Sequence, residues 1–312
     1  MATEIYLGYP PENIKKWIKA EAERKYQEML KTPLTFTAEE AGSTIKMVKY
    51  DLAPNVYLET SYTGEEGSWS DFIVCTNGEN GNSNNDGTVI TLANVGDKVY
   101  FRAKQDNQQF AIDGNKCNKF VMTGKIAASG NINTLLKADG SVLNLTGRNY
   151  CYFYMFRDCS SLTQAPELPA TTLANRCYDR MFDSCTSLTQ APALPATTLA
   201  DYCYNSMFEG CTSLTQAPKL PATTLANGCY SSMFNYCSSL TQAPELPATT
   251  LANNCYGNMF KGCTSLTQAP KLPAMTLVDS CYSGMFSYCK SLTQAPELPA
   301  TTLANNCYDS MF

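Results

Sequence analysis

Histidine is absent from this 312-residue sequence, so the side chain that most often transfers protons near neutral pH is missing. The sequence also lacks a motif that pairs a nucleophile with a base, and it has no glycine-rich phosphate-binding loop. Carboxylates are plentiful, but no spacing in the sequence pairs them. We therefore expect a protein that is not an enzyme, with no catalytic residues and no cofactor.

Positive charge is also scarce. The chain has 23 Lys and Arg residues against 28 Asp and Glu, which gives a net charge of -5, so no basic surface is offered to nucleic acid. No apolar run is long enough to span a bilayer, and the start of the chain lacks the basic and apolar regions of a secretory signal. This start favours a protein that is made and assembled in a cytoplasm. The alternative is an export signal that lies outside this sequence.

Cysteine, in contrast, is abundant, with fifteen residues. Thirteen of them recur with the repeat described below, without a Cys-x-x-Cys spacing, so we expect no metal site. Such a count in a secreted protein usually indicates disulfides. Here we favour reduced thiols that pack as small apolar groups, with disulfides between neighbouring repeat units as the alternative.

Residues 1–32 form a segment of their own, in which helix-forming residues predict an amphipathic helix. Its apolar stripe comprises Ile14, Trp17, Ile18, Ala22 and Met29. The stripe is expected to pack on the chain's own next domain, to dock the protein on a larger assembly, or to lie on a membrane surface. We take Ile14, Trp17, Ile18 and Met29 as candidate anchor residues for partner binding.

Residues 33–108 change to a period of two, with six short runs of β-branched and aromatic residues separated in part by glycine. This spacing predicts a small all-β sandwich of the immunoglobulin-like kind, without the Cys and Trp signature of antibody domains. The polar loop Asn77–Gly87 raises the hypothesis of a calcium site, although it lacks the ligand spacing of an EF-hand. Residues 109–150 are expected to form an atypical end unit that caps the following repeats.

Residues 151–312 repeat a 26-residue unit six times and begin a seventh. We number positions within a unit from its first Cys. Apolar residues at positions 1, 2, 5, 6 and 9 predict one face of a short helix, and a proline in every TQAP limits the strand that follows. Units of this kind bury their apolar faces only against their neighbours, which predicts a solenoid. The expected repeat core is represented by Cys203, Tyr204, Met207, Phe208, Cys211 and Leu214.

The array resembles the leucine-rich repeats of the BspA-like bacterial surface-protein family, whose units read roughly LPxxL…AFxxCxxL. The matching residues read LPATTLAN-CYxxMFxGCTSL, as in Leu220–Leu240. The period is a few residues longer than usual, and Met-Phe stands where the family often has Ala-Phe. The sandwich followed by KFVMTGKIAASGNI also resembles the front half of repeat proteins of gut bacteria and their phages. The resemblance implies adhesion and recognition at a surface.

Positions 3, 4, 7 and 8 vary between units and are expected to face outward. Their variety indicates either neutral drift on a solvated face or a tunable recognition surface, in which exposed tyrosines are typical contact residues. The candidate recognition residues are Tyr154, Arg180, Asn205, Tyr236, Lys261 and Tyr288. By contrast, the Thr and Gln of TQAP do not vary. We expect them to stack in columns with a structural role, or alternatively to form a flat ligand face.

These observations favour a phage virion structural protein, located at the virion surface and attached to capsid or tail. Its N-terminal segment would bind other virion proteins, and its repeats would contact a host cell-surface protein or glycan. The alternative is an extracellular adhesin of the bacterial cell surface. A homo-oligomer is possible, whereas nucleic acid binding and membrane insertion are not expected.

Overall fold

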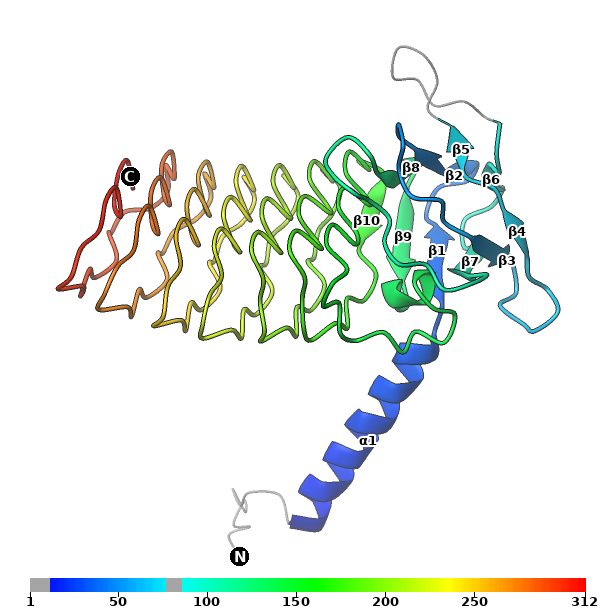
Figure 1. The fold of residues 1–312 in the computed structure, drawn as a ribbon, viewed down its shortest axis with the longest axis horizontal. Coiled ribbons are helices and arrows are strands. Elements are labelled where there is room, and N and C mark those ends of the chain that lie inside the picture. The colour runs from blue at the N-terminus through cyan, green and yellow to red at the C-terminus, as the bar shows by residue number, and fades with distance from the viewer. Residues whose placement is uncertain (1–11, 77–85) are drawn as a thin grey trace, which may run out of the picture.

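The computed structural model describes residues 12–76 and 86–312, which form one helix, two β-sheets and a long stacked array (Figure 1). The elements are α1 (Glu12–Lys31), β1 (Leu34–Ala38), β2 (Ser43–Lys49), β3 (Leu58–Ser61), β4 (Ser70–Phe72), β5 (Cys75–Thr76), β6 (Ile90–Leu92), β7 (Lys98–Ala103), β8 (Asn118–Thr123), β9 (Ile126–Ser129), the 3₁₀ helix η2 (Ile132–Leu135) and β10 (Leu162–Gln164).

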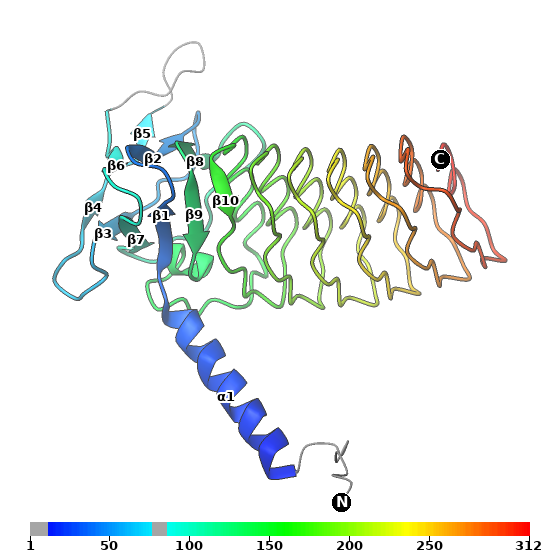
Figure 2. The same ribbon diagram turned by 180° about the vertical axis from the view of Figure 1, so that it is seen from behind.

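The expected N-terminal helix is confirmed as α1, which projects away from the rest of the described chain (Figures 1 and 2). It begins with an acidic residue, Glu12, and ends with a basic one, Lys31, the arrangement that the helix dipole favours. Arg24 adds ion pairs to Glu21 and Glu28 one turn away on either side. These local features support a helix that has few contacts with the remaining chain.

The period-two segment forms two sheets. One has the strand order β10-β9-β1-β7-β3-β4, and in the other β5, β6 and β8 all pair with β2. Alternate residues of β2, β7 and β8 are buried, as expected for strands with one face on a core. The two sheets meet through aromatic rings: Phe36 of β1 contacts Phe120 of β8 edge to face, with ring centroids 5.1 Å apart.

Three strands beyond residue 108, β8, β9 and β10, belong to these sheets. β8 pairs with β2 over six residues, and β9 pairs with β1. β9 also pairs in parallel with β10 of the first repeat unit, so the six-stranded sheet runs directly into the array. The expected division at residue 108 therefore falls between β7 and β8 of these sheets, and sheet and array share one hydrophobic core.

The base of α1 is fixed to the sheet by the buried side chain of Asn131. Its amide nitrogen donates to the carbonyl oxygens of Leu30, at 2.7 Å, and Gly140, at 3.0 Å. Its backbone N–H donates to the Thr32 carbonyl at 2.9 Å. Buried polar groups with complete hydrogen bonding hold one geometry firmly. The helix is therefore firmly rooted at its C-terminal end.

Gly130, next to Asn131, permits this close approach. Its φ is +77°, and a Cβ atom at this residue would lie 2.1 Å from the backbone oxygen of Pro33. We expect Gly130→Ala to lower the free energy of unfolding by about 2–5 kcal/mol, because a left-handed backbone and a steric clash add together. Chemical denaturation measures this loss.

Gly96→Ala is the matched control, because Gly96 has a φ of +89° and open space around its Cβ direction. It should lose only the backbone contribution of roughly 1–2 kcal/mol. Equal losses in the two variants would show that the contact with Pro33 does not constrain the root of α1.

The repeat units stack in register, but the prediction of a short helix in each unit is wrong. Residues 151–158, and the equivalent residues of later units, form consecutive turns. Backbone N–H groups alternate in direction: Met155 donates to Tyr152 within its own turn at 3.1 Å, whereas Tyr152 donates to Cys177 of the next unit at 2.8 Å. Half of these donors thus hold the turn and half join neighbouring units, which satisfies the buried backbone without a helix.

Two columns of stacked rings form the centre of the array. Tyr at position 2 and Phe at position 6 stack on their equivalents in the next unit, with centroids 5.4–5.9 Å apart. Phe110 starts the Tyr column on Tyr152, and Phe120 starts the Phe column on Phe156. The residues before the repeats therefore supply the first ring of each column and cover the first unit.

Candidate binding surface on the turns of the repeat array

The variable positions lie on one edge of the array, which we call the turn face: positions 3, 4, 7 and 8 of each unit. The backbone there has a four-residue period, since φ is positive at positions 4, 8 and 26 of nearly every unit. Examples are Tyr154 (62°), Arg180 (54°), Tyr236 (59°) and Asn258 (54°). A left-handed backbone is uncommon for residues other than Gly, Asn and Asp.

Sequence reasoning missed this backbone pattern, although a signal for it was present. Gly occurs at 210, 228, 262 and 284, and Asn at 254, 258 and 306, all of them at positions 4, 8 or 26. These are the residues that favour a left-handed backbone. Part of the variation that resembled neutral drift is therefore a choice among residues compatible with one backbone conformation.

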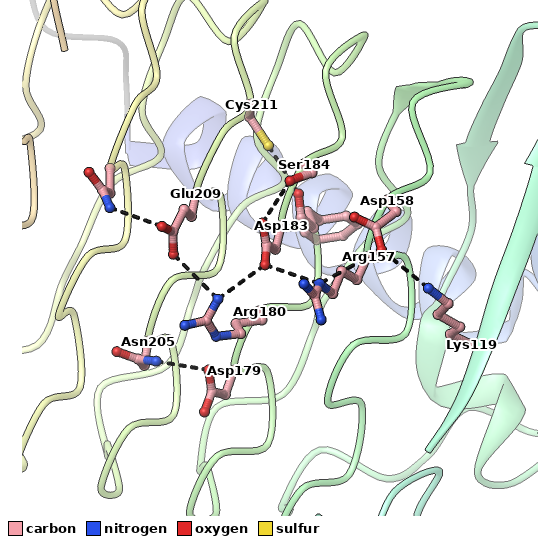
Figure 3. A network of polar contacts seen from close by, with 12 residues as sticks. Lys119, Arg157, Asp158, Asp179, Arg180, Asp183, Ser184, Asn205, Glu209 and Cys211 are labelled. Atoms are coloured by element: carbon pink, nitrogen blue, oxygen red, sulfur yellow. Dashed lines mark hydrogen bonds and ion pairs between the residues drawn. The ribbon is translucent and has the colours of Figure 1, made fainter. Parts of the chain in front are cut away.

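A network of charged side chains crosses the turn face near the sheets (Figure 3). Lys119 of β8 contacts Asp158 of unit 1 at 3.2 Å. Arg157 of unit 1 and Arg180 of unit 2 both contact Asp183, at 3.3 and 3.2 Å. Arg180 also reaches Glu209 of unit 3 at 3.6 Å, completing a chain of alternating charges from the sheet into the third unit.

The carboxylates of this region are more buried than an outward-facing position implies. The side chains of Asp179 and Asp183 are only 1% and 7% exposed, which corrects the expectation that positions 3 and 7 face solvent. Burial raises the pKa of Asp179, opposed by hydrogen bonds from Asn205 and Arg176. Burial lowers the pKa of Arg180, but Glu209, Tyr154 and Asp183 outweigh this effect and leave it raised.

The charged side chains of the network pair with one another. Each carboxylate within it faces an Arg or Lys side chain, and Asn235 donates to Glu209 at 2.9 Å to extend the contacts into unit 4. A buried ion pair contributes little net stability, because the cost of desolvating both charges offsets much of their attraction. Its main effect here is to hold the two side chains in one geometry. We interpret the network as a device that sets the register between the sheets and the first units.

The six candidate recognition residues fall into two groups. Tyr154, Arg180 and Asn205 are engaged within the chain: Arg157 stacks 4.4 Å above the Tyr154 ring, Arg180 belongs to the network, and Asn205 donates to Asp179 at 2.9 Å. Tyr236 and Tyr288 are 51% and 65% exposed. Lys261 is half-buried and belongs to unit 5, which lies between the units of Tyr236 and Tyr288. Only the second group is open to a ligand.

The six repeat-core residues lie inside the array. Cys203, Tyr204, Met207, Phe208, Cys211 and Leu214 are all 0–1% exposed. All fifteen cysteines are buried single thiols. The position-9 thiols have a specific role. In units 2–6 each donates to the carbonyl of a Phe in the preceding unit, as Cys211 does to Phe182 at 3.1 Å, and in unit 1 Cys159 donates to Phe120 of β8. Cysteine at this position therefore packs as an apolar group and also joins two units.

The invariant Gln residues lie where neighbouring units exchange backbone contacts. Gln164, Gln190, Gln216 and Gln242 form successive parallel bridges. The neighbouring Thr189 N–H donates to the Thr163 carbonyl at 3.4 Å. These backbone contacts are consistent with a structural role for the two columns. The bridge is one residue long in most units, as a nearby proline requires.

The anchor candidates divide between the two ends of α1. Ile14, Trp17 and Ile18 are 44%, 66% and 52% exposed. Met29 is half-buried and, with Tyr26, lines a shallow pocket against Pro166 and Pro192 of the first two units. The last turns of α1 thus pack on the array, while Trp17 and Ile18 of the first turns are more than half exposed.

Metal and membrane sites receive little support from the described ranges. No cluster of three His, Cys, Asp or Glu side chains suited to a metal ion occurs in residues 12–76 and 86–312. The calcium hypothesis concerned residues 77–87, of which 77–85 lie outside the described residues. Within the described chain, no helix combines the length and apolar character needed to cross a membrane.

Comparisons with known proteins identify no relative. No family model, no curated protein and no solved structure matches this chain.

Proposed function

We propose that this chain is a non-enzymatic structural protein of a phage virion. In this proposal α1 anchors the protein to other virion proteins, and the array displays the turn face to a host surface. We further propose that the two sheets are an immunoglobulin-like sandwich, and that the array is a leucine-rich-repeat solenoid related to the BspA-like proteins. The resemblance of the repeat residues supports this relation.

The observation that carries the proposal is a firmly rooted helix on which the apolar side chains of Trp17 and Ile18 are more than half exposed. Hydrogen bonds from Asn131 fix the base of α1, whereas Trp17 at the other end is 66% exposed. A large apolar side chain on a helix that lacks tertiary cover is a typical anchor for a groove in a partner protein. The rigid base would transmit this attachment to the sheets and the array.

The array suits display because each unit contacts only its neighbours, so its length can change without changing its ends. It extends from the sheets in a direction different from that of α1 (Figures 1 and 2). Attachment and display are therefore assigned to separate parts of the molecule. The alternative is a bacterial cell-surface adhesin. It would use the same array for display, but its N-terminal end would be attached to the bacterial envelope and not to virion proteins.

The test is incorporation into particles, with Trp17→Glu as the variant. We expect Trp17→Glu to reduce the amount of this chain in purified particles at least about tenfold, because a charge replaces an apolar contact at the centre of an interface. Its melting temperature should be unchanged, since substitutions at exposed sites usually alter stability by less than about 0.5 kcal/mol. Quantitative mass spectrometry of the particles measures the effect.

Val95→Glu is the matched control, because Val95 is similarly exposed, at 67%, but lies in the loop before β7. It should be incorporated like the unchanged chain. Incorporation of Trp17→Glu at the normal level would contradict the anchor. Detection of the chain on bacterial envelopes and its absence from particles would favour the adhesin instead.

A further inference from the structure

Position 8 of the turn face alternates between glycine and tyrosine over four successive units: Gly210, Tyr236, Gly262 and Tyr288. All four residues have a positive φ, with values of 59° and 63° at the two tyrosines. Glycine adopts this backbone without strain, whereas a bulky side chain there is uncommon. The two tyrosines therefore occupy positions whose backbone, common to every unit, favours glycine over a bulky side chain.

Gly262 makes room for the ring of Tyr236. A Cβ atom at residue 262 would lie 2.5 Å from Cδ1 and 2.8 Å from Cε1 of Tyr236. The ring of Tyr236 thus lies over the backbone of the next unit, in the space where another side chain would project. One side of the ring is covered by Gly262, and the residue remains 51% exposed. An aromatic ring held against a flat surface in this way is a stacking platform.

The surroundings of these rings are mostly neutral. The turn-face positions of units 5 and 6 carry Asn258, Ser283 and Ser287, together with Lys261. The ion pairs of the charged network end at Glu209 of unit 3, which accepts a hydrogen bond from Asn235 beside Tyr236. By contrast with Tyr236, the ring of Tyr154 in unit 1 is covered by the guanidinium of Arg157. The units furthest from the sheets therefore combine open aromatic rings with hydroxyl and amide groups.

We propose that Tyr236 and Tyr288 form a binding site for a neutral β-1,4-linked polysaccharide that runs along the array. This site would supply the ligand for the adhesion function proposed above, and its biological role rests on that proposed function. Sugar rings present C–H groups that stack on aromatic faces, and their hydroxyls bond to amides and hydroxyls nearby. Successive sugars of a β-1,4-linked chain are turned over, so that every second one presents the same face.

The geometry of the array fits this repeat. Neighbouring units are one stacking step apart, which is 5.7 Å between Phe234 and Phe260 and 5.8 Å between Phe260 and Phe286. Tyr236 and Tyr288 are two units apart, hence about two such steps. That separation is close to the length of two sugars in an extended β-1,4-linked chain, which would allow the two rings to stack on alternate sugars. An uncharged polymer is favoured because the net charge of -5 on the chain disfavours an anionic one.

The test is binding of the full chain to insoluble chitin and to cellulose, with starch as the α-linked comparison. We expect retention on at least one β-1,4-linked polymer and none on starch. Tyr236→Ala and Tyr288→Ala should each weaken binding about tenfold, as expected for the loss of one stacking ring. Tyr236→Phe should bind like the unchanged chain, because stacking does not require the hydroxyl.

Tyr62→Ala is the matched control, since Tyr62 is 63% exposed but follows β3 in the sheets. It should bind normally, and melting temperatures should show that all variants are folded. No retention on either β-1,4-linked polymer, or retention that both alanine variants leave unchanged, would overturn the site. Particle incorporation is measured separately with Trp17→Glu. Tyrosine-dependent glycan binding by a chain absent from particles would therefore refute the virion proposal alone.

Discussion

Raising the pH above about 9 is expected to unfold this protein within roughly one pH unit. Burial raises the pKa of thirteen cysteine thiols, reaching about 12 at Cys159 and about 11 at Cys117 and Cys289. In the unfolded chain these thiols ionise near pH ~8.5. Their contribution to stability is therefore complete below that pH and is lost as the pH rises toward the folded-state values.

The size of this effect follows from the number of thiols. Each group that ionises only in the unfolded chain lowers the free energy of unfolding by about 1.4 kcal/mol per pH unit. Thirteen such groups together exceed the total stability of a typical domain, about 5–15 kcal/mol. The buried tyrosines of the ring column, such as Tyr204 and Tyr256, add to the loss at higher pH, because burial raises their pKa as well.

Circular dichroism from pH 7 to pH 11 in the presence of a reductant measures this transition. Return to pH 7.5 should restore the signal, which separates ionisation from chemical damage. Between pH 6 and pH 7 the guanidinium midpoint should stay nearly constant, because free thiols are almost entirely neutral there in both states. A folded protein at pH 11 would show that the thiols are not buried as described.

Phe208→Ala is expected to lower the free energy of unfolding by about 3–5 kcal/mol. The Phe208 ring is fully buried and stacks between Phe182 and Phe234, with centroids 5.6 and 5.7 Å away. Its removal leaves a cavity in the middle of the ring column, where the rigid stacking of both neighbours prevents collapse. Guanidinium denaturation followed by tyrosine fluorescence measures the loss.

Phe312→Ala offers a control within the same column. Phe312 stacks on Phe286 at 5.9 Å, but its other face is open and the residue is 59% exposed. Its replacement should lower stability by less than about 1 kcal/mol, since little apolar area returns to water. A similar loss in both variants would mean that the column does not stabilise the array through burial.

Several elements followed from local sequence patterns alone. Helix formers on a stripe of apolar residues predicted α1, and the period of two predicted a β structure for the following segment. The sequence did not predict β8 and β9 as strands of these sheets, because they lie in a segment whose glycines resemble a degenerate repeat. Their place in the sheets depends on pairing with β1 and β2, which lie about seventy to ninety residues earlier.

The wrong prediction of a short helix in each repeat unit has a definite physical cause. Apolar residues at positions 1, 5 and 9 have a period of four, close to the helical 3.6, so a short segment fits either a helix or consecutive turns. Hydrogen bonds from alternate N–H groups to the next unit decide between them. The presence of that neighbour is a tertiary fact, and the Gly and Asn residues at positions 4, 8 and 26 gave only an indirect signal of it.

The candidate site divides in the same way. That Tyr236 and Tyr288 are variable-position tyrosines was visible in the sequence, as were the absence of histidine and the net negative charge. That Tyr154, Arg180 and Asn205 are engaged internally was not, because their partners Arg157, Glu209 and Asp179 belong to other turns or other units. The periodic sequence by itself determined which side chains form the core, since every unit must bury the same apolar face. Only the tertiary structure decided which variable residues remain free, because burial and pairing between units depend on how closely the units stack.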